Sequence, residues 1–179
     1  TTIIENTARK LNADEGFSEG GQVIGGEYGS GKSHIELVLY HLFNSPELGR
    51  KWLNQQGIDV DIPDETQSAA LQMFNLDREY NRLSAAVGDY LGIETWAEGE
   101  LPTVHDIRDE LEDSPTIILI DEFERWFGMA DRAEYRDDNL AFLQNVLEAA
   151  GRDDTRLSVL ISLLYEDDDV QAITQRTNP

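Results

Sequence analysis

One segment of this sequence constrains the fold more than any other. Residues 26–33 read Gly-Glu-Tyr-Gly-Ser-Gly-Lys-Ser, which is a complete G-x-x-x-x-G-K-[ST] pattern. A short strand-like stretch at residues 22–25 precedes it, and an apolar run with helical periodicity follows it. This strand-turn-helix context is what the pattern requires. The alternative is a glycine-rich turn between a strand and a helix that matches the pattern by chance.

We call residues 26–33 the phosphate loop, because the pattern predicts phosphate binding. Gly29 and Gly31 let successive backbone N–H groups converge on phosphate oxygens, and the next helix presents its positive end to the same anion. Lys32 is expected to reach the β- and γ-phosphates, and the Ser33 hydroxyl is expected to coordinate Mg²⁺. The residues predicted to bind ATP here are Gly26, Glu27, Tyr28, Gly29, Ser30, Gly31, Lys32 and Ser33.

A second motif follows downstream. Residues 116–121 read Thr-Ile-Ile-Leu-Ile-Asp, a continuous apolar run typical of a parallel strand that is buried on both faces. Asp121 and Glu122, which we call the acid pair, end this run. We expect Asp121 to bind Mg²⁺ together with Ser33, and Glu122 to be the catalytic residue that orients and polarises the attacking water. The pair favours hydrolysis of ATP over transfer of its phosphate to a small acceptor. The alternative interpretation of residues 116–122 is an ordinary strand whose acidic end is solvated.

A third polar group interrupts the apolar run at residues 157–164. Ser162 would lie in the carboxyl half of a neighbouring strand, where its hydroxyl could sense the γ-phosphate. A hydroxyl that is satisfied inside the sheet is an equally good interpretation. Four arginines are candidates for the cation that hydrolysis needs, and we assign none of them because a solvated surface role suits each: Arg125, Arg132, Arg136 and Arg152.

The rest of the chain alternates predicted strands and helices. Strands are expected at residues 22–25, 69–74, 116–121 and 157–164, with helices after the phosphate loop, around Trp52, over 80–91, after Thr103 and before Gly151. This order predicts an α/β fold of the P-loop NTPase class, ASCE/AAA-like, with a parallel sheet covered by helices on both faces and ligands at the carboxyl ends of its strands. We assign residues 1–21 to an N-terminal lead-in segment and residues 22–179 to the ATPase domain, which we expect to be a piece of a larger protein.

The charge balance is strongly acidic. Among 179 residues, 36 are acidic and 14 basic, for a formal net charge of −22, and the lysines are Lys10, Lys32 and Lys51. This pattern indicates the cytoplasm of a halophile, where high salt screens self-repulsion, although an ordinary acidic domain is the alternative. Such a surface repels nucleic acid, so DNA contact is expected only through partners or through regions outside this chain.

The sequence lacks cysteine, a membrane-spanning run and a secretory signal, which favours a cytoplasmic location without membrane contact.

Several segments together resemble a family: the phosphate loop with His34, residues 39–42, residues 118–122 and residues 160–163. From about residue 21 to 165 the chain is similar to the large P-loop ATPases of prokaryotic phage-defence islands. These include the BrxC and PglY proteins of BREX and phage-growth-limitation systems, and ATPases linked to DNA phosphorothioation. The resemblance implies ATP bound by residues 29–33, Mg²⁺ held by Ser33 and Asp121, and catalysis by Glu122.

The resemblance also implies a motor or switch subunit in a complex that modifies DNA or excludes phages. Other defence proteins are then the expected partners, a homo-oligomer is possible by analogy, and the acidity fits a haloarchaeal member. Members of the family are typically many hundreds of residues longer. Two alternatives stay open: an archaeal replication initiator of the Orc/Cdc6 kind, which a basic winged-helix domain would identify, and a scaffold that binds ATP with little turnover.

Overall fold

The computed structural model describes residues 2–14, 16–17, 19–73, 80–112, 114–127 and 130–164. At its centre lies a four-stranded sheet in the order β1-β4-β3-β2, and each neighbouring pair is parallel. The strands are β1 (Gly21–Gly26), β2 (Gln67–Gln72), β3 (Thr116–Asp121) and β4 (Leu157–Leu164). The predicted α/β class with a parallel sheet is therefore confirmed. Phe74, the expected last residue of the second strand, lies outside the described residues.

Each face of the sheet has its own apolar core. All six residues of β3 are buried, and alternation along the strand sends Ile118 and Ile120 into one core and Ile117 and Leu119 into the other. A strand between two cores has no solvated face, which explains its continuous apolar sequence.

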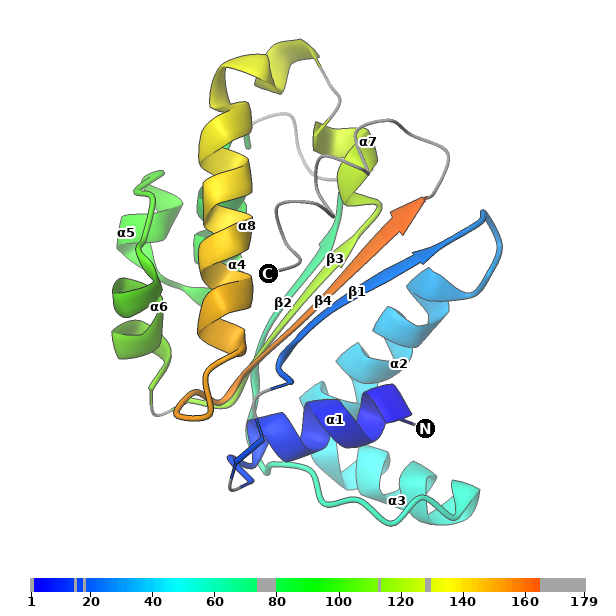
Figure 1. The fold of residues 1–179 in the computed structure, drawn as a ribbon. Helices are drawn as coiled ribbons and strands as arrows, with labels where there is room; N and C mark the ends of the chain where they lie inside the picture. The colour runs from blue at the N-terminus through cyan, green and yellow to red at the C-terminus, as the bar shows by residue number, and fades with distance from the viewer. Residues whose placement is uncertain are drawn as a thin grey trace.

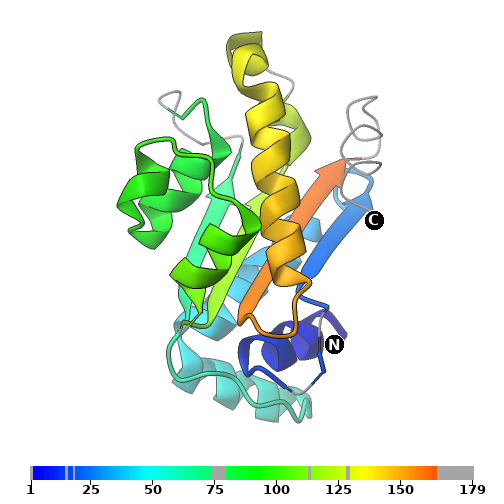
Figure 2. The same ribbon diagram turned by 60° about the vertical axis from the view of Figure 1, so that its left-hand side comes forward.

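Helices cover both faces, as the alternation of elements predicts (Figures 1 and 2). The first core contains side chains of α4 (Leu83–Leu91), α5 (Glu94–Ala97), α6 (Val104–Leu111), α7 (Phe123–Phe127) and α8 (Arg136–Ala150). The second contains side chains of α1 (Thr2–Leu11), α2 (Lys32–Asn44) and α3 (Pro46–Gln56). A 3₁₀ helix, η1 (Ala130–Tyr135), precedes α8.

The helix that the sequence places after Thr103 begins as predicted. The Asp106 N–H donates to the Thr103 hydroxyl at 3.3 Å, and the Thr103 N–H donates to the Asp106 carboxylate at 2.8 Å. This reciprocal capping box satisfies two of the backbone donors that a helix leaves open at its start. Helix α8 ends before Gly151, also as predicted, although Gly151 has φ −72° and therefore does not use a left-handed glycine cap.

The lead-in segment packs onto the sheet rather than away from it. Ile4, Ala8 and Leu11 of α1 belong to the same core as Ile117 of β3. Lys10 is buried beside them, and its ammonium donates a hydrogen bond to the Arg152 carbonyl in the turn between α8 and β4. Helix α1 thus closes the second core at the amino end of β4 (Figure 1). In the described part of the chain, no helix combines the length and the apolar character needed to span a bilayer.

Candidate functional site

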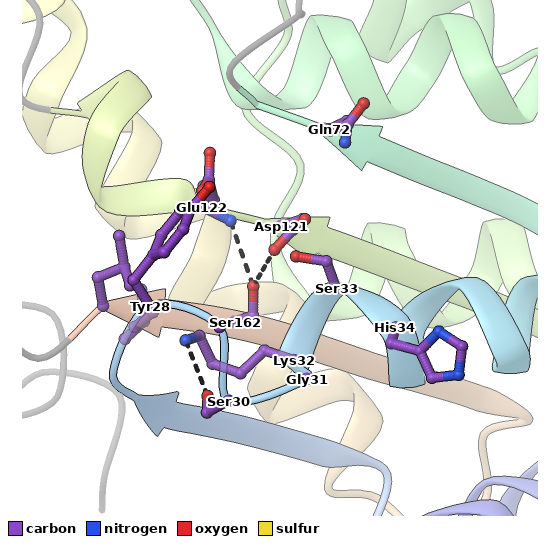
Figure 3. A pocket seen from close by; sticks show the side chains of 13 residues that line it. Tyr28, Ser30, Gly31, Lys32, Ser33, His34, Gln72, Asp121, Glu122 and Ser162 are labelled. Carbon is purple, nitrogen blue, oxygen red and sulfur yellow. Dashed lines mark hydrogen bonds between the residues drawn. The ribbon is translucent and has the colours of Figure 1, made fainter.

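Most of the predicted site residues line one cavity at the carboxyl ends of the strands. The cavity has a volume of about 380 Å³, and Figure 3 shows the side chains around it. Every parallel strand delivers its last residues to this edge, so groups far apart in sequence meet there. The lining residues are Tyr28, Gly29, Ser30, Gly31, Lys32, Ser33, His34, Gln72, Asp121, Glu122, Ser162, Leu163 and Leu164.

The phosphate loop needs glycine at two positions because of their backbone conformation. Gly29 and Gly31 have φ of 79° and 90°, a region that favours glycine, and a Cβ added at either would meet no atom within 4 Å. Backbone conformation, and not space, therefore requires glycine there. At Gly26 space is limited, because a Cβ would lie 2.8 Å from the Ser30 Oγ, and that hydroxyl would have to rotate away. The result is a tight turn that joins β1 to the first residue of α2.

Lys32 is folded into this turn. Its side chain is only 9% exposed, and Nζ donates to the carbonyls of Gly26 at 2.9 Å and Glu27 at 2.8 Å. A third, longer contact reaches the Ser30 hydroxyl at 3.3 Å. These acceptors hold a positive charge inside the loop, next to the N-terminal end of α2, whose partial charge is also positive. The arrangement creates an anion-binding environment at the floor of the cavity.

The acid pair faces the phosphate loop across β4. Asp121 is buried, and its carboxylate accepts a hydrogen bond from the Ser162 hydroxyl. The backbone N–H of Glu122 donates to the same hydroxyl oxygen at 3.2 Å. In Figure 3 the Ser33 hydroxyl is directed toward the Asp121 carboxylate, and both residues line the cavity. Ser162 is thus hydrogen-bonded inside the sheet, as one interpretation of the sequence expects, and it also lines the cavity. Its role as a sensor of the γ-phosphate stays a prediction.

Glu122 has an unusual backbone conformation. Its φ is 56°, and among the residues that the structure describes Ala13 is the other non-glycine residue with positive φ. Left-handed conformations cost non-glycine residues roughly 1–2 kcal/mol, and such residues gather at functional sites. The sharp turn between β3 and α7 places Glu122 on the wall of the cavity, directly after the buried Asp121.

The polar residues of this region that were not predicted as site residues include Gln72 and Glu36. Gln72 ends β2 and is aligned with Asp121 in the sheet register, so it lies on the cavity wall. Glu36 lies one turn after Ser33 on α2 and is only 6% exposed. Burial, followed by the nearby charge of Asp121, raises the pKa of Glu36 to about 8, against the opposing effects of the Ser162 hydrogen bond and Lys32. Helical spacing could have revealed Glu36, because it shares a face with Leu39 and Phe43.

All the predicted site residues except Gly26 and Glu27 line the cavity, and they differ in exposure. Ser33 is exposed, and the Tyr28 side chain is 82% exposed at the rim. Of the candidate arginines whose side chains the structure describes, neither Arg136 nor Arg152 lines the cavity. Arg152 lies in the turn before β4, at the opposite edge of the sheet, where it pairs with Glu148. The Arg136 guanidinium packs over the Phe127 ring, and the side chains of Arg125 and Arg132 lie outside what the structure describes.

Comparisons of the chain with protein-family models, with curated proteins and with solved structures found no match.

Proposed function

We propose that this chain is a P-loop ATPase domain of the ASCE/AAA-like class, which binds ATP with Mg²⁺ and hydrolyses it. The observation that carries the proposal is the meeting of Lys32 and Ser33 with Asp121 and Glu122 around one cavity, although the two pairs are far apart in sequence. The strand order supports the class. Strand β4 lies between the strand that leads into the phosphate loop and the strand that ends in the acid pair.

The donor groups fit a magnesium nucleotide. The left-handed glycines Gly29 and Gly31 keep the turn open toward the cavity. Phosphate oxygens would replace Ser30 and loop carbonyls as partners of Lys32. The Ser33 hydroxyl and the Asp121 carboxylate are oxygen ligands of the kind that Mg²⁺ prefers, and phosphates and water would complete its coordination. Bound Mg²⁺ would neutralise negative charge on the phosphates.

The chain's own groups then account for hydrolysis. Glu122, on the cavity wall, would orient a water molecule for attack on the γ-phosphorus and accept a proton from it. The bond between the γ-phosphorus and the bridging oxygen breaks, and ADP and phosphate are released. Lys32 would stabilise the negative charge on the phosphate oxygens throughout. Ser162 fixes both acid-pair residues through its hydroxyl, which supports a role near the γ-phosphate.

The wider role that we propose is that of a motor or switch in a cytoplasmic phage-defence complex that acts on DNA. The sequence resemblance to the BrxC and PglY type of ATPase supports this role, and the net charge of −22 supports a haloarchaeal origin. The same charge favours DNA contact through partner proteins, because nucleic-acid affinity depends on basic side chains. Stimulation of ATP turnover by DNA together with partner proteins, in a buffer with molar KCl, would test this role.

Equilibrium binding of ATP with Mg²⁺ tests the site itself. Lys32→Ala removes the charge inside the loop, and we expect at least a hundredfold loss of affinity, which corresponds to about 2.7 kcal/mol. Lys51→Ala is the matched control, because Lys51 is an exposed lysine on α3. Equal affinity of the two variants would contradict the proposed site.

A further inference from the structure

Strand β2 forms one edge of the sheet (Figure 1), and among the described strands β3 is its single neighbour. The Gln67 N–H donates to the Pro115 carbonyl, so the odd-numbered residues of β2 pair with β3. Successive residues of a strand direct their backbone N–H and C=O groups to opposite sides. Ser68 and Ala70 therefore turn these groups toward the outer edge of the sheet, where another strand could pair with them.

The sequence of β2 does not protect this edge. Proteins usually protect an edge strand with charged side chains, proline or a β-bulge. Residues 67–72 read Gln-Ser-Ala-Ala-Leu-Gln, without charge or proline, in a chain of which 28% is charged. The register with β3 is continuous over all six residues, which leaves no place for a bulge. The edge is thus open to pairing with a further strand.

A cavity of about 500 Å³, which we call the edge cavity, lies between α2 and β2. Alternation along β2 places Ala70 on the α2 side of the sheet, and its small side chain leaves space beside Leu37 and Tyr40 of α2. Leu37 is 52% exposed. A strand added to β2 would lie about 4.8 Å from it, and its side chains on this face would cover Leu37. Residues 21–25 of β1, the other edge strand, line neither cavity.

The edge cavity is acidic where it adjoins the phosphate loop. Glu36 and Asp121 both line it, and each is only 6% exposed. The Oε1 atom of Glu36 has no hydrogen-bond partner within the part of the chain that the structure describes. Among the described residues that line the edge cavity, none is a lysine or an arginine. A cation there would favour the charged form of Glu36, whose pKa is raised by burial, and would pair with it.

The charge of the chain distinguishes two kinds of occupant. A second copy would bring two surfaces of net charge −22 together, and its own β2 strand would offer no cation to the acids of the cavity. A basic segment of a different protein is attracted to the same surface. Charge complementarity therefore favours a basic segment.

We propose that the outer edge of β2 and the edge cavity form a docking site for an extended segment of a partner protein, which adds a strand to β2 and places a lysine or arginine against Glu36. Backbone hydrogen bonds to the edge would supply affinity, and alternate apolar side chains would cover Leu37 and Tyr40. Ser33 and Asp121 line both cavities, so the bound segment would lie beside the proposed nucleotide site. The docking site does not depend on ATP hydrolysis.

Selected peptides provide the probe. Random peptides of about ten residues, displayed on phage and selected on the nucleotide-free chain, should converge on sequences with one lysine or arginine and apolar residues at alternate positions. Fluorescence anisotropy of the synthesised peptides then gives their affinity for the chain and its variants.

Two pairs of variants test the location of the site. Leu37→Arg places a like charge in the edge cavity and should weaken binding about tenfold or more, whereas Leu48→Arg, at a position on α3 that is 69% exposed and lines neither cavity, should stay within about threefold. Ala70→Pro removes an outward N–H without breaking the pairing with β3, and it should weaken binding by a similar factor. Val23→Pro is its control, because Val23 has the corresponding outward position on β1.

Two further readouts test the contacts themselves. Replacing the basic residue of the peptide by glutamine should weaken binding to the original protein about tenfold or more, and binding to Glu36→Gln by no more than about twofold, since that variant has already lost the interaction. In NMR hydrogen exchange, bound peptide should slow the Ala70 amide about tenfold or more. The Ala69 amide, which faces β3, should change little.

Peptides that bind Leu37→Arg or Ala70→Pro as tightly as the original protein would overturn the proposal. A selection that recovers no binding peptide, or only peptides without a basic residue, would also overturn it. Dimerisation of the original protein that Ala70→Pro abolishes would identify a second copy as the occupant and overturn the proposed partner. Loss of ATP turnover plays no part in these outcomes, so a failure of the proposed function is distinguishable from a failure of the docking site.

Discussion

The Ser162 hydroxyl on β4 donates a hydrogen bond to the Asp121 carboxylate on β3, across 41 positions of sequence. The contact forms because β3 and β4 are parallel neighbours, and because both side chains lie near the carboxyl ends of their strands. The same hydroxyl accepts a hydrogen bond from the Glu122 N–H, so one buried serine orients both members of the acid pair.

The positive φ of Glu122 predicts opposite effects of glycine on stability and on function. Glu122→Gly relieves a left-handed conformation and should raise the free energy of unfolding by up to about 1 kcal/mol, because greater freedom of the unfolded chain offsets part of the gain. ATP turnover should be lost with the carboxylate. Denaturant unfolding and an ATPase assay measure the two effects.

Ala13→Gly is the matched control, since Ala13 has φ 55° and lies outside the cavity. It should change stability in the same direction and leave turnover intact. A Glu122→Gly variant that hydrolyses ATP normally would contradict the catalytic role of the side chain.

Glu36 predicts a pH dependence of stability in the nucleotide-free protein. Burial and Asp121 raise its pKa in the folded state from 4.5 to about 8. Between these two pKa values the folded state holds a proton on Glu36 that the unfolded state has released. The bound proton stabilises the folded state, and this stabilisation is lost as pH rises from about 4.5 to about 8. Each pKa unit corresponds to about 1.4 kcal/mol, so the total effect is on the order of a few kcal/mol.

The difference between the original protein and Glu36→Gln isolates this contribution from all other titrating groups. Measured in EDTA, the stability of Glu36→Gln relative to the original protein should increase steadily between pH 5 and pH 8. A difference that does not change with pH would show that Glu36 titrates normally.

The acidic surface predicts stabilisation by salt. With a net charge of −22, self-repulsion opposes the compact state, and ions screen it. Raising KCl from about 0.1 M to about 2 M should therefore raise the melting temperature. A gain of about 2 kcal/mol would appear as roughly 4–8 °C in a chain of this size. A melting temperature that stays constant or falls would contradict the interpretation of the charge pattern.

Elements with a strong local pattern were predictable from sequence. The continuous apolar run of β3, the stripe of α2 and the Thr103 and Asp106 capping box all form close to their expected residues. The short helices α5 and α7 and the 3₁₀ helix η1 were not predicted, because four to six residues are too few to show a helical period. Trp96 and Trp126 anchor two of these helices, and both side chains are buried.

The sequence predicts which residues form the site better than it predicts the contacts between them. Motifs identify Lys32, Ser33, Asp121 and Glu122 individually, and the strand order determines that they meet. Spacing along the chain does not reveal the φ of Glu122 or the hydrogen bond between Ser162 and Asp121, because both arise from tertiary packing. Gln72 was missed because the second strand was expected to extend to Phe74, which moved the predicted strand end past it.

ATP hydrolysis by the original protein and by Glu122→Gln, in molar KCl with Mg²⁺, tests the central claim most directly when ATP binding is measured in parallel. We predict that Glu122→Gln binds ATP within about threefold of the original affinity and loses turnover by at least a hundredfold, because the amide keeps the shape of the side chain but cannot accept the proton. Equal turnover in the two proteins, or equal loss of binding and turnover in the variant, would contradict the account.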